Sequence, residues 1–168
     1  MILNMGCGGT CFGDVNIDVN KKVFNLKEKK VFLQCDAHHL PFKSNCFSQI
    51  YSIDVLEHVD SPANYLREAK RVLINEGFLM LGTPNAMRVL NFLFIIKHGF
   101  YIPHQDHISL WGRIELENLV KRIGFSCFVV FPYTYGDTKH NFIANLFLEL
   151  LSWRKDLSDR QLVVLAKK

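Results

Sequence analysis

The sequence predicts an α/β fold built on a mostly parallel sheet. Short runs rich in β-branched and aromatic residues recur along the chain, and segments with helical periodicity lie between the later runs. A Gly-x-Gly turn at Gly6 and Gly8 directly follows the first apolar run. Strands that alternate with helices favour parallel pairing, with the helices packed on the faces of the sheet.

Seven strands are predicted. Each is a short apolar run with turn residues near its ends, which is the pattern of a buried strand. They span residues 2–5, 15–19, 31–35, 48–53, 78–83, 125–131 and 161–166.

Helices are predicted between the later strands. Ser61 is expected to be an N-cap with Pro62 in the first helical position, and this helix is expected to end at 75–77. Segment 115–123 carries its apolar residues on one face and is expected to end at Gly124. Two further helices are predicted at 89–97 and 141–153.

Length and composition indicate one globular domain, 1–168. The chain is 49% hydrophobic and 21% charged, which excludes a disordered tail. Its net charge of +4 comes from scattered basic residues, so there is no clear nucleic-acid signal. The five cysteines are irregularly placed, which favours a reducing cytoplasm. The longest apolar run, 89–96, is shorter than the roughly 20 residues of a transmembrane helix.

Two motifs about thirty residues apart outline a nucleoside pocket. The first is Asn4-Met5-Gly6-Cys7-Gly8-Gly9, whose glycines let the backbone approach a ligand without interference from a Cβ atom. The second is Cys35-Asp36-Ala37-His38-His39-Leu40-Pro41-Phe42, and Asp18 lies between the two. Carboxylates at the ends of parallel strands can accept hydrogen bonds from ribose hydroxyls and an exocyclic amine.

Further segments follow these motifs in a recognisable order. They are Asp54-Val55-Leu56-Glu57-His58, Arg71-Val72-Leu73, Asp106-His107-Ile108-Ser109-Leu110-Trp111, Ile123-Gly124-Phe125 and the closing run 162–168. Together with the two motifs, this order resembles the class I S-adenosylmethionine-dependent methyltransferases, of the small type 11-like kind. The resemblance implies a Rossmann-like, doubly wound sheet of seven strands in the order 3-2-1-4-5-7-6, with the last strand antiparallel.

The resemblance also implies that the cofactor is S-adenosylmethionine and that its product is S-adenosylhomocysteine. It implies a role for each motif as well. The glycine loop would approach the amino-acid end of the cofactor, and Asp18 would accept hydrogen bonds from the ribose hydroxyls. Asp36 would accept a hydrogen bond from the adenine amine, and the Ala37 amide would donate to an adenine ring nitrogen. The segment 52–54 would border the methionine moiety. The cofactor-binding residues implied are Gly6, Cys7, Gly8, Asp18, Asp36, Ala37, Ser52, Ile53 and Asp54. No metal is expected.

The methyl acceptor cannot be named from the residues, although a small molecule is expected. Alignment of donor and acceptor supplies much of the acceleration of an in-line displacement, so a catalytic base is not obligatory. Tyr101, His104 and His107 follow the fifth predicted strand, where this family builds its acceptor site, and they are the candidates for such a role. Glu57 and His58 are expected to support structure.

Segments 89–96 and 142–151 are more apolar around their circumference than a surface helix requires. Core packing is the default interpretation. The alternatives are that they cover an apolar acceptor, form the interface of a homodimer or touch a membrane surface.

Three other functions compete with this one. Thiolate and imidazole ligands for zinc could come from Cys7, Cys11, Cys35, His38 and Cys46, although their spacings are loose. A nicotinamide dehydrogenase would need a third glycine where the chain has Cys11, and about 20 residues before its acidic residue. The third alternative is a methyltransferase fold that binds a ligand or partner without catalysis.

The third alternative depends on two departures from the family pattern. Only twelve positions separate Gly6 from Asp18, so the first crossover helix is expected to be missing. Its N-terminal amides and dipole would favour a cofactor carboxylate. The chain also begins at the first strand, without the N-terminal helices that often cover the cofactor in this fold.

Overall fold

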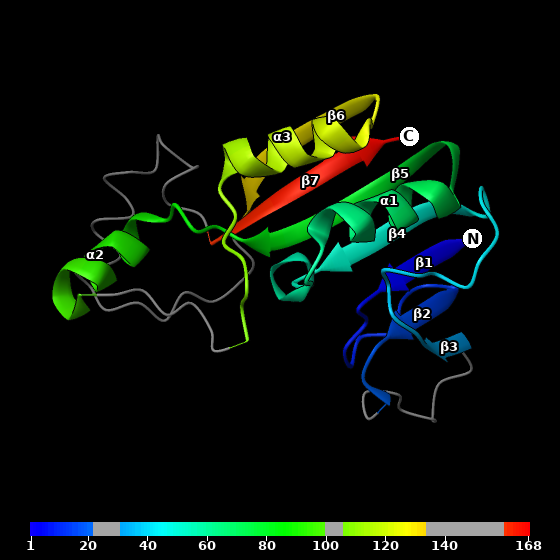
Figure 1. Cartoon of the computed structure of the whole chain (residues 1–168), viewed down its shortest axis with the longest axis horizontal. Coiled ribbons are helices and arrows are strands. Elements are labelled where there is room, and N and C mark those ends of the chain that lie inside the picture. Colours follow the sequence, from blue (N-terminus) through cyan, green and yellow to red (C-terminus); the bar gives the residue numbers. More distant parts are fainter. Residues whose placement is uncertain (22–30, 100–105, 134–159) are drawn as a thin grey trace.

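The computed structural model describes residues 1–21, 31–99, 106–133 and 160–168. Seven strands of this part of the chain form one sheet in the order β3-β2-β1-β4-β5-β7-β6 (Figure 1). The strands are β1 (Ile2–Met5), β2 (Val15–Asp18), β3 (Val31–Gln34), β4 (Phe47–Ile53), β5 (Leu73–Pro84), β6 (Cys127–Tyr133) and β7 (Gln161–Lys167). The seven predicted strands and the implied sheet order are confirmed, although β5 begins five residues before the predicted start at 78.

The first five strands of the sheet order, from β3 to β5, pair in parallel, whereas β7 runs antiparallel to both its neighbours. The inner strand β1 is deeply buried, and its apolar residues Leu3 and Met5 are fully inaccessible. Because the carboxyl ends of parallel strands share one edge of a sheet, the residues that follow β1, β2, β3 and β4 lie near one another.

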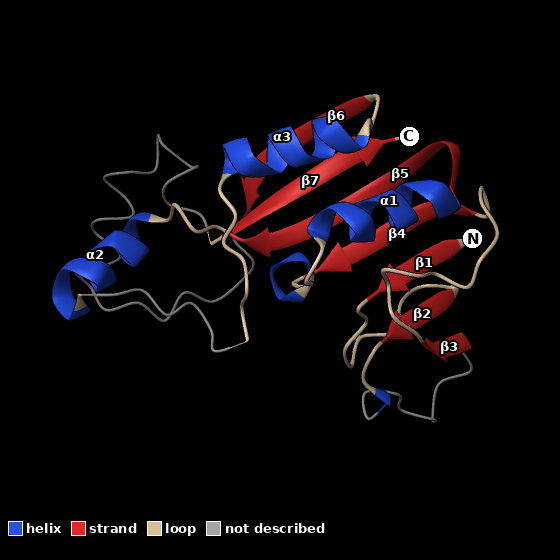
Figure 2. Cartoon of the chain, viewed as in Figure 1, coloured by secondary structure: helices blue, strands red, loops and turns tan. Residues whose placement is uncertain are grey.

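Two helices cover one face of this sheet, α1 (Pro62–Val72) and α3 (Arg113–Ile123) (Figure 2). Their apolar faces bury Leu66 and Ala69 from α1, and Leu116 and Val120 from α3, against the strands. The predicted helix end at Gly124 is confirmed, since this residue has a φ of 87° and its amide bonds to the carbonyl of Lys121.

The end of α1 differs from the prediction. The helix stops at Val72 and not at 75–77, because Leu73 is fully buried and pairs with Phe47 as the first residue of β5. Ser61 does occupy the N-cap position, but its side chain makes no capping bond. Its backbone carbonyl accepts from the amide of Tyr65 instead.

Residues 6–14, all of them described, connect β1 to β2 without a helix, as the short spacing predicted. Two buried asparagines hold this connection together. The Asn4 amide group donates to the carbonyl of Thr10 at 2.7 Å and to the Asn16 side chain at 3.3 Å. Asn16 in turn accepts from the amide of Gly13 and donates to its carbonyl. Side-chain hydrogen bonds thus satisfy backbone groups that a helix would have paired.

The helix α2 (Val89–His98) lies beyond the end of β5, apart from the sheet (Figure 1). None of its residues is buried, and Ile96 is 80% exposed. The default expectation that 89–96 packs into the core is therefore wrong. The predicted helix 141–153 lies outside the described residues. Among the described helices, none is both long enough and apolar enough to cross a membrane.

Candidate functional site

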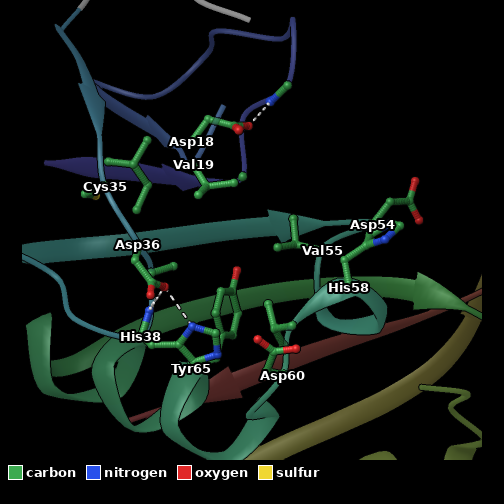
Figure 3. A pocket seen from close by; sticks show the side chains of 15 residues that line it. Asp18, Val19, Cys35, Asp36, His38, Asp54, Val55, His58, Asp60 and Tyr65 are labelled. Atoms are coloured by element: carbon green, nitrogen blue, oxygen red, sulfur yellow. Dashed lines mark hydrogen bonds and ion pairs between the residues drawn. The ribbon is translucent and has the colours of Figure 1, made fainter. Parts of the chain in front are cut away.

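A pocket of about 500 Å³ opens at the edge where the parallel strands end (Figure 3). Its lining combines the glycine loop after β1, the ends of β2 and β3, the turn after β4 and the first turn of α1. The lining residues are Gly6, Gly8, Ile17, Asp18, Val19, Cys35, Asp36, Ala37, His38, Asp54, Val55, His58, Val59, Asp60 and Tyr65.

The glycine loop needs its glycines. Gly6 and Gly8 have φ values of 67° and 51°, in the left-handed region that favours glycine. A Cβ atom on Gly6 would lie 2.3 Å from a methyl group of Val55, so the loop and the turn after β4 meet without room for a side chain. The concave wall that results is made of backbone.

Cys7, between these glycines, lies outside the pocket lining. It is 5% exposed, and its amide donates to the carbonyl of Ile17 at 2.9 Å. Burial, followed by the charge of Asp18, raises the pKa of the Cys7 thiol to about 11. The thiol therefore stays protonated at neutral pH and is a poor metal ligand or nucleophile.

Asp18 ends β2 and faces the glycine loop. One carboxylate oxygen accepts from the amide of Gly8 at 2.9 Å, and the other accepts from the amide of Asn20 at 2.8 Å. Each carboxylate oxygen has a second lone pair, so both can still accept from a ligand hydroxyl. Figure 3 shows the contact between Asp18 and the loop at the rim of the pocket.

Asp36 follows β3 and is held by His38. The carboxylate accepts from the His38 amide at 2.8 Å and from ring nitrogen Nδ1 at 2.7 Å. The other ring nitrogen, Nε2, accepts from the amide of Ser61 at the start of α1. Nδ1 therefore carries the ring proton. The hydrogen bonds from His38 lower the pKa of Asp36, whose side chain is 59% exposed.

At the end of β4, one residue lines the pocket and its neighbours do not. Asp54 lines the pocket with a φ of 55°, and it accepts from the Gln161 side chain at 2.8 Å. Burial raises the pKa of Asp54, and the hydrogen bond from Gln161 offsets part of this rise. Ser52 is fully buried and shares a 2.6 Å hydrogen bond with the hydroxyl of Tyr65. Ile53 does not contribute to the lining.

The structure thus brings together Gly6, Gly8, Asp18, Asp36, Ala37 and Asp54, six of the nine residues implied for the cofactor. The remaining three, Cys7, Ser52 and Ile53, are not part of the lining: Cys7 and Ser52 are buried, and Ile53 is 37% exposed outside the pocket. Sequence reasoning missed Tyr65 as a wall of the pocket, because its position on the apolar face of α1 signals only core packing. It treated His38 only as a zinc ligand, although its spacing from Asp36 suits a local Asx turn.

A second group of polar side chains borders the pocket at His58. The η2 turn (Leu56–His58) carries Glu57 and His58, and His107 lies against them. Glu57 is 1% exposed, and one of its oxygens accepts from the hydroxyl of Thr83 at 3.0 Å. Burial raises the pKa of Glu57, against its hydrogen bonds. Tyr101 and His104, the other two predicted catalytic candidates, lie outside the described residues.

Part of the chain matches a known family of sequences. Residues 3–81 match the sequence model of a methyltransferase domain family, of type 11. This stretch makes up just under half of the chain, and over it the chain is similar to a methyltransferase domain. The stretch contains the glycine loop, Asp18, Asp36 and the segment 52–58, so the family match and the pocket rest on the same part of the chain.

Solved structures extend the likeness to methyltransferases to the fold of nearly the whole chain. A possible histamine N-methyltransferase from Thermotoga maritima superposes with a TM-score of 0.76 at 17% identity, over 99% of this chain and 81% of that one. An S-adenosylmethionine-dependent methyltransferase from Archaeoglobus fulgidus superposes with a TM-score of 0.69 at 13% identity. This superposition covers 99% of this chain and 85% of that one. The fold is that of the class I methyltransferases.

A curated protein is also similar to this chain in sequence. An uncharacterised protein from Methanocaldococcus jannaschii is 37% identical over 98 residues, which are 51% of this chain and 41% of the relative. The match therefore spans less than half the length of that protein.

Proposed function

We propose that this chain binds S-adenosylmethionine in the pocket and transfers its methyl group to a small-molecule acceptor. The observation that carries the proposal is that Asp18, Asp36 and the glycine loop line one pocket within the stretch that matches a methyltransferase domain. Pocket volumes of roughly 300–1,000 Å³ are usual for ligands of this size, and the volume of about 500 Å³ lies in that range.

The residues present fit the parts of the cofactor. Asp18 presents two oxygens to the ribose diol, and Asp36 presents a carboxylate to the adenine amine, with the Ala37 backbone beside it. The wall without side chains at Gly6 leaves room for the amino-acid end. When bound, the sulfonium group of the cofactor supplies an electrophilic methyl group.

The chain itself would contribute orientation. An in-line displacement gains most from holding donor and acceptor at the right distance and angle. The Ser52–Tyr65 hydrogen bond joins β4 to α1 behind the pocket, and the close approach of Val55 to Gly6 packs the turn after β4 against the glycine loop. We propose an apolar acceptor, because a second hollow of about 350 Å³ at the start of α2 is lined by Ala86, Met87, Asn91, Phe92, Ile95, Leu110, Gly112 and Glu115.

Calorimetric titration with S-adenosylhomocysteine tests the cofactor assignment. We expect saturable binding by the wild type, weakened roughly tenfold or more in Asp18→Asn, since a carboxylate contributes about 1.5–3 kcal/mol per charged hydrogen bond. Asp14→Asn is the matched control. Asp14 also accepts from a backbone amide, that of Ile2 at 2.8 Å, but it lies at the opposite end of β2.

Two results would decide against the assignment. Absence of saturable binding by the wild type at millimolar ligand would remove the cofactor from the proposal. Equal loss of affinity in Asp14→Asn and Asp18→Asn would mean that the substitutions act through stability, which thermal unfolding of both variants measures directly.

A binding role without catalysis is the alternative proposal. It is favoured by the helix-free connection between β1 and β2, which lacks the helix amides that would favour a cofactor carboxylate. In that case S-adenosylhomocysteine binds weakly or not at all, and no acceptor is labelled in a screen with methyl-labelled S-adenosylmethionine. We also propose a reducing compartment such as the cytoplasm, since none of the five cysteines, which all lie within the described residues, forms a disulfide.

A further inference from the structure

We propose that Glu57, His58 and His107 form a binding site for a divalent transition-metal ion at the border of the pocket. One ligand atom from each residue lies within 4.8 Å of the other two. Ligand atoms that share an ion at about 2.0–2.2 Å lie roughly 3–3.5 Å apart, so small side-chain rotations would close the site. This departs from the expectation of no metal.

Glu57 supplies the independent observation that points to a cation. Its Oε2 accepts from Thr83, but its Oε1 is buried and has no hydrogen-bond partner among the described residues. Nε2 of His58 lies 4.0 Å from this Oε1, beyond hydrogen-bond distance. A buried carboxylate oxygen without a partner is costly, and buried charges are normally paired or bound to metals.

His58 is already oriented as a metal ligand. Its Nδ1 lies 3.0 Å from the carbonyl oxygen of Asp106, and because a carbonyl only accepts, Nδ1 carries the ring proton. Nε2 of the neutral ring therefore keeps its lone pair, and this is the nitrogen that lies on the side of the Glu57 carboxylate. A backbone carbonyl bound to the other ring nitrogen is the usual outer partner of a metal-binding histidine.

Backbone hydrogen bonds position His107 beside Glu57 and His58. The carbonyl of Glu57 accepts from the amides of both Ile108 and Ser109, at 2.9 and 3.2 Å. This double anchor holds the His107 ring against that of His58, with the ring centroids 4.7 Å apart and nearly perpendicular planes. Residues about fifty positions apart in the sequence are thus fixed around one point.

The donor set identifies the class of ion. Two imidazole nitrogens with one carboxylate suit Zn²⁺ and neighbouring first-row ions better than Mg²⁺ or Ca²⁺, which prefer oxygen alone. Three protein ligands leave a position for water or an acceptor oxygen. His58 also lines the pocket, so a hydroxyl bound to the ion would lie at its border and lose its proton more readily.

Titration of the metal-depleted protein with Zn²⁺ and with Co²⁺, by calorimetry and visible absorption, tests the site. We expect one equivalent of each ion to bind, with at least tenfold weaker binding in His58→Gln and in His107→Gln. His98→Gln is the control, because His98 lies on α2 away from the cluster. For Glu57→Gln the metal affinity is compared together with the thermal unfolding of the variant, since Glu57 also accepts a hydrogen bond from Thr83.

Three results would overturn the proposal: no stoichiometric binding to the wild type, wild-type affinity in both His58→Gln and His107→Gln, or thiolate charge-transfer bands in the Co²⁺ spectrum. The last result would move the ion to the cysteines. The site does not rest on the proposed function. Titration of the same metal-depleted protein with S-adenosylhomocysteine reports the cofactor site separately.

Discussion

Gly6 joins two walls of the pocket at a single backbone position. Its φ of 67° and the 2.3 Å that would separate a Cβ atom there from Val55 give two independent reasons for glycine. The left-handed conformation alone costs another residue roughly 1–2 kcal/mol. The contact with Val55 adds a displacement of the turn after β4, which carries Asp54 and His58 into the pocket.

Gly6→Ala is therefore expected to weaken S-adenosylhomocysteine binding at least tenfold and to lower the melting temperature. Gly9→Ala is the matched control in the same loop, since Gly9 has no left-handed φ and a Cβ there would meet no described atom within 4 Å. Calorimetry and thermal unfolding of both variants check the prediction. Wild-type affinity in Gly6→Ala would show that the glycine loop is not part of the binding surface.

At the scale of elements, α1 holds the loop that follows β3. Arg71 donates to the carbonyl oxygens of Leu40 and Phe42 at 2.9 and 2.8 Å, and it forms a two-pronged ion pair with Glu68. Glu68 also accepts from the amide of Leu40 at 2.8 Å. The loop that presents Asp36 is thus fixed to the helix at its far end.

The ion pair between Glu68 and Arg71 predicts a pH dependence of stability. Hydrogen bonds from Arg71 lower the pKa of Glu68 in the folded protein. Its contribution is therefore fully present above the ordinary glutamate pKa of about 4.3, and it is lost as the pH falls through the lowered folded value. The free energy of unfolding of Glu68→Gln should lie roughly 1–2 kcal/mol below that of the wild type at pH 7, and the difference should shrink below about pH 4.

Urea unfolding at several pH values measures this difference. Glu117→Gln is the control, because the pair of Glu117 with Arg113 is exposed and should contribute less than about 0.5 kcal/mol. A difference between wild type and Glu68→Gln that stays constant from pH 7 to about pH 3.5 would contradict the assigned role of the carboxylate.

The same elements show what the sequence could predict. Strand positions and the convergence of Asp18 with Asp36 follow from local patterns, because residues after parallel strands must share an edge. The contacts of His38 with Ser61, and of Asn4 with Asn16, join segments that no local pattern relates. The early end of α1 could not be predicted for a similar reason: the pairing of Leu73 with Phe47 overrides the turn residues that follow.

At the scale of the whole molecule, two groups of exposed apolar side chains among the described residues are candidates for an interface between copies of the chain. On the sheet face opposite α1 and α3, Val129 and Leu165 are adjacent in register and 58% and 43% exposed. The helix α2 exposes Phe92, Leu93, Phe94, Ile95 and Ile96. A ten-residue helix is marginal on its own in water, so α2 has more need of a packing partner than the hydrogen-bonded sheet.

We therefore expect the chain to self-associate through α2, with a molar mass that rises with concentration in sedimentation equilibrium. Ile96→Lys should weaken this association roughly tenfold or more, because burying an isoleucine contributes about 1.5–3 kcal/mol. Lysine near the end of a helix also suits the helix dipole, so the helix itself should persist. Val129→Lys, on the exposed sheet face, should leave the association unchanged. A monomeric mass at all concentrations would contradict the prediction, and sensitivity to Val129→Lys alone would move the interface to the sheet.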